Sequence, residues 1–185
     1  MQAAGRIRTY CSAACRQKGY RQRSRNRYPA EMTSSPRWVM ADHKRPLRVD
    51  GSPASSTNQA TWTEFSKVAK KPHGFMLGGG FACIDLDHCF KDGKLQRWAS
   101  RIIDAAPGAF IERSVSGDGL HIFGLLPEGK GRNYGRVEVY SAARFIRTTA
   151  NVWARGELIA LTNTVKTIDE MNRAGKLPSK LTPRR

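Results

Sequence analysis

The sequence is poor in acidic residues. Its 15 Asp and Glu stand against 32 Lys and Arg in a chain of 185 residues, which gives a formal net charge of +17. Between Met1 and Tyr28 there is no acidic residue at all. An excess of positive charge this large indicates a polyanionic partner, most often nucleic acid, with an anionic membrane surface as the rival interpretation.

Long apolar runs are also missing, and cysteine is sparse. No apolar run approaches the roughly 20 residues that span a bilayer, and no apolar segment follows the basic N-terminus as it would in a secretory signal. Four cysteines in a chain without such a signal are better interpreted as thiols or metal ligands than as disulfides. We therefore expect a cytoplasmic protein that does not associate with membranes.

Residues 1–31 form a basic arm that we expect to be flexible. Cys11 and Cys15 lie in a segment that resembles the second half of a small zinc-binding module, but zinc needs four ligands in a structural site. No cysteine pair precedes them, so we expect no working zinc site; Met32 is a plausible alternative start. The basic residues expected to contact nucleic-acid phosphates are Arg16, Lys18, Arg21 and Arg23 in the arm, with Lys44 and Arg45 beyond it.

The rest of the chain alternates between strand and helix patterns, which predicts an α+β protein. Thr61 to Glu64 is typical of a capping box opening a short helix, with Trp62 in the core. The triple glycine Gly78–Gly80 favours a hairpin turn between two strands. Further strands are expected over 109–114, 119–126, 136–140 and 144–149, and helices over 95–103 and 164–174. The segment 124–131 is a near miss for a P-loop, since Gly131 follows Lys130 and no helix pattern comes after it.

Asp85 and Asp87 interrupt the apolar, β-prone stretch Phe81–Phe90. Because successive side chains of a strand alternate faces, the two carboxylates should point the same way. Like charges this close repel unless a cation lies between them, and oxygen ligands suit Mg²⁺ or Mn²⁺. The simpler alternative is a strand end whose Asp residues cap the next element.

His121 and Glu138 are expected on the same face as the Asp pair. If Leu120 and Ile122 face the core, His121 faces the other side, and Glu138 alternates in the same way with Val137 and Val139. Gly117 and Gly119 precede His121, and glycines let backbone N–H groups approach an anion. A lone His in a strand is otherwise usually a half-buried, hydrogen-bonded residue.

Three segments in this order resemble the archaeo-eukaryotic primase superfamily, and within it the bifunctional primase/polymerase (prim-pol) domain of phages and plasmids. The segments are Ile84–Cys89 with its Asp-x-Asp, Ser114–Phe123 ending its glycine-rich loop at His121, and Val137–Tyr140 with Glu138. The similarity runs from about residue 38 to about residue 149. It implies an RRM-like antiparallel or mixed sheet flanked by helices, with a catalytic domain over 32–162 and a C-terminal helix and basic tail over 163–185.

The resemblance implies template-dependent nucleotidyl transfer in the cytoplasm of a host cell. Asp85, Asp87 and Glu138 would hold two Mg²⁺ or Mn²⁺ ions, and Ser116, Gly117, Gly119 and His121 would contact the triphosphate of a dNTP or NTP. Arg144 and Arg147 would neutralise incoming phosphates, single-stranded DNA would be the template, and a separate replicative helicase is a further expected partner. Relatives often have Gly where this chain has Ala150. The alternatives are a catalytically inactive, nucleic-acid-binding replication accessory protein and, ranked last, a metal-dependent nuclease.

Overall fold

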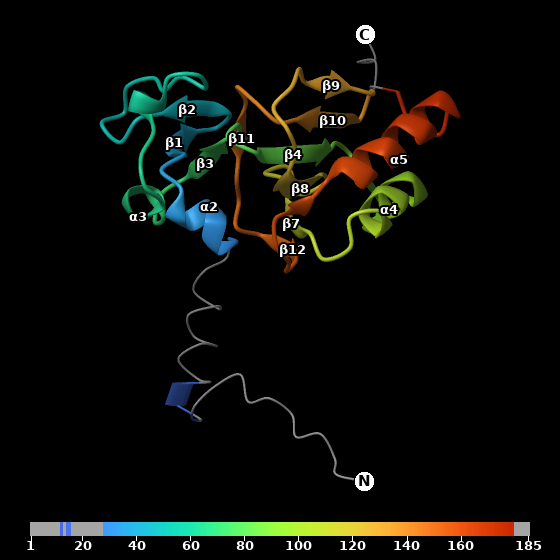
Figure 1. Cartoon of the computed structure of the whole chain (residues 1–185), viewed down its shortest axis with the longest axis horizontal. Helices are drawn as coiled ribbons and strands as arrows, with labels where there is room; N and C mark the ends of the chain where they lie inside the picture. The colour runs from blue at the N-terminus through green and yellow to red at the C-terminus, as the bar shows by residue number, and fades with distance from the viewer. Residues whose placement is uncertain (1–11, 13, 16–27, 180–185) are drawn as a thin grey trace.

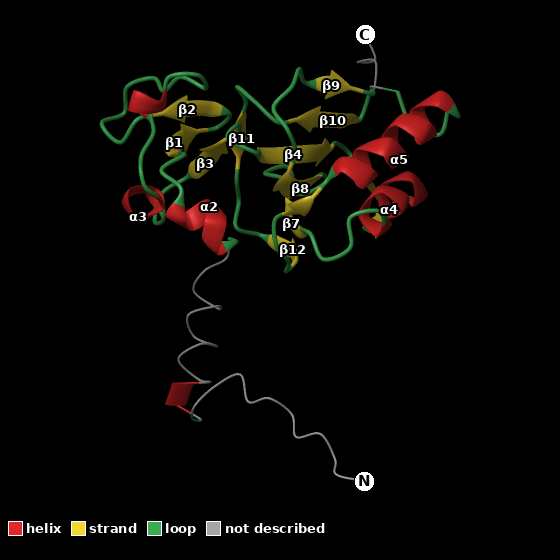
Figure 2. Cartoon of the chain, in the orientation of Figure 1, coloured by secondary structure: helices red, strands yellow, loops and turns green. Residues whose placement is uncertain are grey.

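The computed structural model describes residues 12, 14–15 and 28–179, and this part of the chain is an α+β structure with mostly antiparallel sheets (Figures 1 and 2). Cys11, Arg16, Lys18, Arg21 and Arg23 lie outside the described residues, as does the end of the basic tail. Ser12 accepts a hydrogen bond from the backbone N–H of Cys15, as an N-cap does.

A four-stranded antiparallel sheet forms the smaller lobe, in the order β11-β3-β1-β2. Its strands are β1 (Trp38–Asp42), β2 (Arg45–Leu47), β3 (His73–Met76) and β11 (Phe145–Arg147), and the helical segments beside it are α2 (Ala30–Ser34), a 3-10 turn (Gln59–Thr61) and α3 (Phe65–Val68). Trp38 is fully buried at its centre, with its ring 4.6 Å from Phe65 and 5.0 Å from Phe75.

The expected capping box was wrong. The helix begins only at Phe65, its N-cap is Glu64, and no side chain caps it. Trp62 is half-buried rather than in the core: its ring lies 5.0 Å from the Arg37 guanidinium, and its indole N–H donates to Ser55 O. The tryptophan buried in this core is Trp38 instead.

The larger sheet has the order β12-β7-β8-β4-β10-β9, with β13 added in parallel beside β8. Its strands are β4 (Phe81–Leu86), β7 (Phe110–Arg113), β8 (Leu120–Leu125), β9 (Arg132–Asn133), β10 (Val137–Tyr140), β12 (Val152–Ala154) and β13 (Ile159–Ala160). A separate hairpin pairs β5 (Phe90–Lys91) with β6 (Lys94–Leu95).

Two helices cover one face of the larger sheet: α4 (Arg97–Asp104) and α5 (Thr162–Arg173) (Figure 1). The alternation of β4 explains the packing, because Ala82, Ile84 and Leu86 face these helices while Asp85 faces away. Helix α4 was predicted from its apolar periodicity and α5 from the glycine and proline that follow it, and both are confirmed, with α5 beginning two positions before the expected start.

Gly78–Gly80 does make a tight turn, and all three glycines have positive φ. The hairpin expected around it was wrong, however, because β3 and β4 belong to different sheets. Gly78 and Phe81 form a single isolated β-bridge, and at this turn the chain passes from the smaller sheet to the larger. The turn therefore joins the two lobes instead of pairing two neighbouring strands.

The packed unit extends past both expected domain boundaries. Tyr28 is 4% exposed and belongs to the core cluster around Trp38, although it precedes residue 32. Val165, Ile168 and Met171 of α5 are buried against the larger sheet, although they follow residue 162. No helix in the described residues is both long and apolar enough to cross a membrane.

Candidate active site

A row of polar side chains crosses four adjacent strands on the face of the larger sheet that α4 and α5 leave uncovered. The register pairs Glu112 with His121, His121 with Asp85, and Asp85 with Glu138. Directly opposed residues of antiparallel strands project from the same face. The expectation that Asp85, His121 and Glu138 share one face is therefore confirmed by the strand register.

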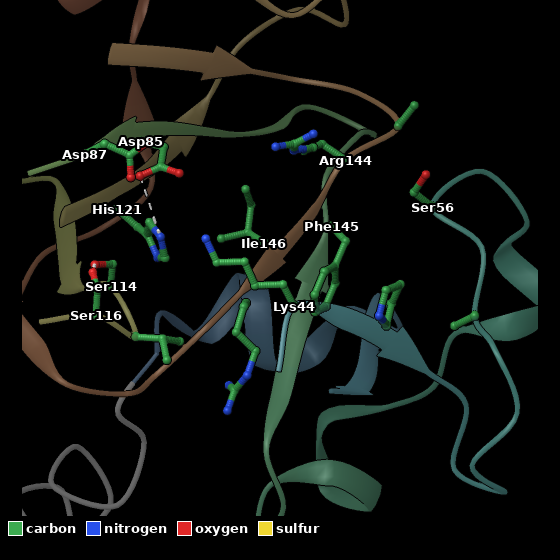
Figure 3. A pocket seen from close by; sticks show the side chains of 15 residues that line it. Lys44, Ser56, Asp85, Asp87, Ser114, Ser116, His121, Arg144, Phe145 and Ile146 are labelled. Atoms are coloured by element: carbon green, nitrogen blue, oxygen red, sulfur yellow. Dashed lines mark hydrogen bonds and ion pairs between the residues drawn. The ribbon is translucent and has the colours of Figure 1, made fainter. Parts of the chain in front are cut away.

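A cavity of about 620 Å³ opens beside this row, between the two lobes. Asp85 and Asp87 lie next to each other at one end, and His121 lies beneath them (Figure 3). Its lining residues are Lys44, Pro46, Ala54, Ser56, Asp85, Asp87, Ser114, Val115, Ser116, His121, Ala143, Arg144, Phe145, Ile146 and Arg147. This volume is in the range that binds small molecules the size of a nucleotide.

Burial dominates the electrostatics of Asp85. Its side chain is 20% exposed, and desolvation raises its pKa from 3.8 to about 6, with the nearby charges of Asp87 and Glu138 acting in the same direction and His121 opposing them. The buried Oδ1 atom has no hydrogen-bond partner and lies 3.8 Å from His121 Nε2. A buried carboxylate oxygen without a donor is costly unless a cation or a proton satisfies it.

Asp85 and Asp87 fit a divalent cation, because two adjacent carboxylates with one unsatisfied oxygen supply the hard ligands that Mg²⁺ and Mn²⁺ prefer. Glu138 does not complete the set in this conformation. Its Oε1 accepts from Asn133 at 2.5 Å and its Oε2 from the Tyr140 hydroxyl at 2.7 Å. Among the described residues, no three His, Cys, Asp or Glu side chains form a metal-binding group.

Glu112 is a member of the site that the sequence did not reveal. It is 0% exposed, and its Oε1 accepts from His121 Nδ1 at 3.1 Å. Its Oε2 accepts from the backbone N–H groups of Thr149 and Ala150 and from the Thr149 hydroxyl. The only local signal was an acidic residue between apolar neighbours in a strand, which is not specific.

Glu112 orients the imidazole of His121. With Nδ1–H directed at Glu112, the other ring nitrogen, Nε2, is turned toward Asp85 and the cavity. Burial by itself would lower the pKa of His121, but the hydrogen bond to Glu112 and the charges of Asp85 and Glu112 outweigh it and raise the pKa. The site thus favours an imidazolium that can donate to an anion.

The loop between β7 and β8 forms one wall of the cavity through Ser114, Val115 and Ser116. Gly117 and Gly119 do not supply free donors as expected, because the Gly117 N–H donates to Ser114 O and the Gly119 N–H to Ser114 Oγ. A Cβ at Gly119 would lie 2.8 Å from Ser114 Oγ and 2.9 Å from Leu86 O. These glycines therefore shape the loop. The hydroxyls of Ser114 and Ser116 contact each other at 3.0 Å, and the Ser116 hydroxyl donates to the Asp118 carboxylate, so both are hydrogen-bonded within the loop that lines the cavity.

Of the basic residues predicted to bind nucleotide or nucleic acid, Lys44, Arg144 and Arg147 line the cavity, and the two arginines make further contacts as well. Lys44 lines the cavity from the turn after β1, although it had been assigned to DNA binding. Arg45 forms an ion pair with Asp42 at 2.8 Å and is not part of the lining. Arg144 lies over the Tyr140 ring and 4.0 Å from Glu138, whereas Arg147 donates to His73 O at 2.6 Å and so ties β11 to β3.

Neither the protein-family models nor the curated proteins give a match to the chain.

The pKa of Asp85 makes a prediction about stability. Folding raises this pKa, so in the metal-free protein the protonated Asp85 contributes stability that is fully present below pH 3.8. That contribution is lost as the pH rises from 3.8 to about 6. The cost at neutral pH is up to about 3 kcal/mol. We expect Asp85→Asn, which stays neutral, to increase the free energy of unfolding at neutral pH by up to this amount, measured by urea denaturation in EDTA. Near pH 4 the variant and the wild type should be nearly equally stable, and a loss of stability at neutral pH would contradict the prediction.

Proposed function

We propose that this protein is a primase/polymerase-type nucleotidyltransferase that extends or initiates a strand on a single-stranded DNA template. The observation that carries the proposal is the shared wall of one cavity: Asp85, Asp87 and His121 lie together there, with Lys44 and Arg144 among the other lining residues. Acidic groups for cations and basic groups for phosphates are both needed in phosphoryl transfer.

The sheet topology supports the proposal. β4, α4, β7, β8 and β10 follow one another in the chain, and the four strands lie in the order β10-β4-β8-β7, all antiparallel. This is the strand arrangement of an RRM-like, split βαβ sheet. The second helix of that unit, expected between β8 and β10, is replaced by a loop with the short strand β9, and α5 covers the sheet from the C-terminal side.

In the proposed reaction a primer 3′-hydroxyl attacks the α-phosphate of the incoming nucleotide, and pyrophosphate leaves. Two divalent cations, when bound, would stabilise the attacking and leaving oxygens. Asp85 and Asp87 would hold the cations, and His121 would donate from Nε2 to a phosphate oxygen while Glu112 accepts from its Nδ1. Lys44 and Arg144 would neutralise the remaining phosphate charge, and Glu138 would join the carboxylates only if its hydrogen bonds with Asn133 and Tyr140 were broken.

A second candidate function is nucleic-acid binding without turnover, as in a replication accessory protein. The observation that favours it is the engagement of both Glu138 oxygens by Asn133 and Tyr140, which leaves two carboxylates for cations. Catalysis and binding differ in one measurable respect, which is the formation of a new phosphodiester bond.

Primer extension on single-stranded DNA tests the proposal. We expect the full chain to add the nucleotide complementary to the template when Mn²⁺ or Mg²⁺ is present, and to stop when EDTA is added. Template binding without incorporation would establish the accessory function, and shortened strands would establish a nuclease. Extension without initiation of new strands would indicate that priming depends on a separate helicase-primase partner.

A further inference from the structure

A cluster of one cation and two aromatic rings lies outside the cavity, with one ring exposed and the other two members half-buried. It consists of Phe90, Arg113 and Trp153, which we call the stacking platform. The Arg113 guanidinium lies 4.3 Å from the Phe90 ring and 4.7 Å from the Trp153 ring, and the two rings are 5.2 Å apart. Trp153 nevertheless remains 42% exposed. An exposed indole with a guanidinium beside it is the kind of surface on which a planar base can stack.

A β-bulge places Trp153 in this position. β12 is the terminal strand in the order of the larger sheet, next to β7 (Figure 1). Val152 pairs with Glu112 and Ala154 with Ile111, so Trp153 is an additional residue with no partner of its own across the strand pair. A bulge at a sheet edge commonly redirects a side chain beside a functional site. Here the result is an indole held outward by the backbone.

The platform borders the loop that forms one wall of the cavity, but it lies on the other face of the larger sheet, because side chains alternate along β7 and Arg113 follows Glu112. Arg113 follows Glu112 in β7 and donates from Nη1 to Gly117 O in the loop between β7 and β8. The backbone N–H of Phe90 is directed at Asp118 O of the same loop. Ser114 and Ser116 of this loop line the cavity. A nucleic-acid strand that lies on the platform would reach the cavity by passing around this end of the sheet, along the loop between β7 and β8.

We propose that the stacking platform binds an unpaired base of a single-stranded nucleic acid through the indole of Trp153. This inference rests on the proposed function only in taking the bound strand to be the template. Base stacking on an aromatic side chain is tolerant of sequence and contributes about 1–3 kcal/mol per base, as a template site requires.

The surrounding charge fits a polynucleotide. The hairpin that carries Phe90 also carries exposed Lys91, Asp92 and Lys94, a net charge of one positive, and Arg113 adds a cation beside the two rings. The whole chain has a formal net charge of +17. Double-stranded DNA is attracted by the same positive charges, but its bases are already stacked and paired and so cannot stack on the indole. The platform should therefore contribute to the binding of single strands and not to that of duplexes.

Fluorescence anisotropy with a labelled oligothymidylate of about ten nucleotides tests the proposal. In the full chain, Trp153→Ala should weaken binding about 5- to 100-fold, whereas Trp153→Phe, which keeps a ring, should weaken it about threefold or less. Val49→Ala is the matched control, because Val49 is 43% exposed in the other lobe and outside the platform. A duplex of the same length should bind the wild type and Trp153→Ala equally.

Three results would overturn the platform. The first is an unchanged oligothymidylate affinity in a folded Trp153→Ala variant, and the second is an equal loss of affinity for single strand and duplex. The third, measured by sedimentation with anionic lipid vesicles, is a variant that loses vesicle binding but keeps its oligothymidylate affinity. Circular dichroism and thermal melting of each variant show whether the fold is kept. If the Ala variant does not fold, Trp153→Leu, which keeps apolar bulk but no ring, should weaken oligothymidylate binding by about the same 5- to 100-fold, and an unchanged affinity in it would overturn the platform. If Trp153→Ala weakens oligonucleotide binding while the wild type adds no nucleotide, the platform stands and the proposed function fails. If the wild type adds nucleotides and Trp153→Ala binds the oligonucleotide normally, the proposed function stands and the platform fails.

Discussion

Replacing both Asp85 and Asp87 with Asn is expected to lower templated nucleotide incorporation by about a thousandfold or more. The two carboxylates are the paired acidic groups of the cavity wall, and Asp85 Oδ1 accepts no hydrogen bond, its nearest basic group being His121 Nε2 at 3.8 Å. Amide oxygens carry no net charge and bind divalent cations weakly. The loss corresponds to about 4 kcal/mol or more in the activation free energy. Steady-state primer extension at saturating Mn²⁺ measures it.

The double variant should fold at least as well as the wild type, because it removes a buried charge and a repulsion between neighbours. Asp104→Asn is the matched control, since Asp104 is exposed at the end of α4 on the opposite face of the sheet. Its incorporation rate should equal that of the wild type. A double variant that retains incorporation within about tenfold of the wild type would remove Asp85 and Asp87 from the catalytic site.

Glu112→Gln is expected to lower the turnover number about 10- to 100-fold, an effect typical of groups that orient a functional histidine. The Gln amide oxygen can still accept from the backbone of Thr149 and Ala150, but the buried negative charge opposite His121 is lost. Since Glu112 raises the pKa of His121, the variant should lose its imidazolium at a lower pH. The high-pH limb of the kcat/KM profile should therefore move to lower pH.

The pH profile separates this positioning role from a purely structural one. If Glu112 only held the backbone of residues 149 and 150, Glu112→Gln would reduce the free energy of unfolding and leave the pH limb unchanged. Glu112→Asp keeps the charge with a shorter side chain, so it should restore part of the turnover and return the limb toward its wild-type position. Identical pH limbs in the wild type and Glu112→Gln would contradict the assignment.

The candidate site was predictable where it depends on alternation within one strand. Asp85 lies between Ile84 and Leu86 in the sequence, so its side chain is on the face of the strand that those two apolar residues do not occupy. His121 lies between Leu120 and Ile122 in the same way. The sequence also predicted helices α4 and α5, because apolar periodicity and the glycine and proline that end a helix are local properties. The glycine-rich turn was recognised, but the sheet to which each flanking strand belongs was not.

The sequence by itself determined the strong positive charge, the α+β class, and the side of its strand on which each acidic or imidazole group lies. Only the tertiary structure decided that Glu112 lies opposite His121, that Lys44 reaches the cavity, and that a bulge turns Trp153 outward. The physical reason is the range of the interactions involved. The face of a side chain follows from the backbone of its own strand, whereas the register between strands depends on packing and hydrogen bonds between residues far apart in the chain.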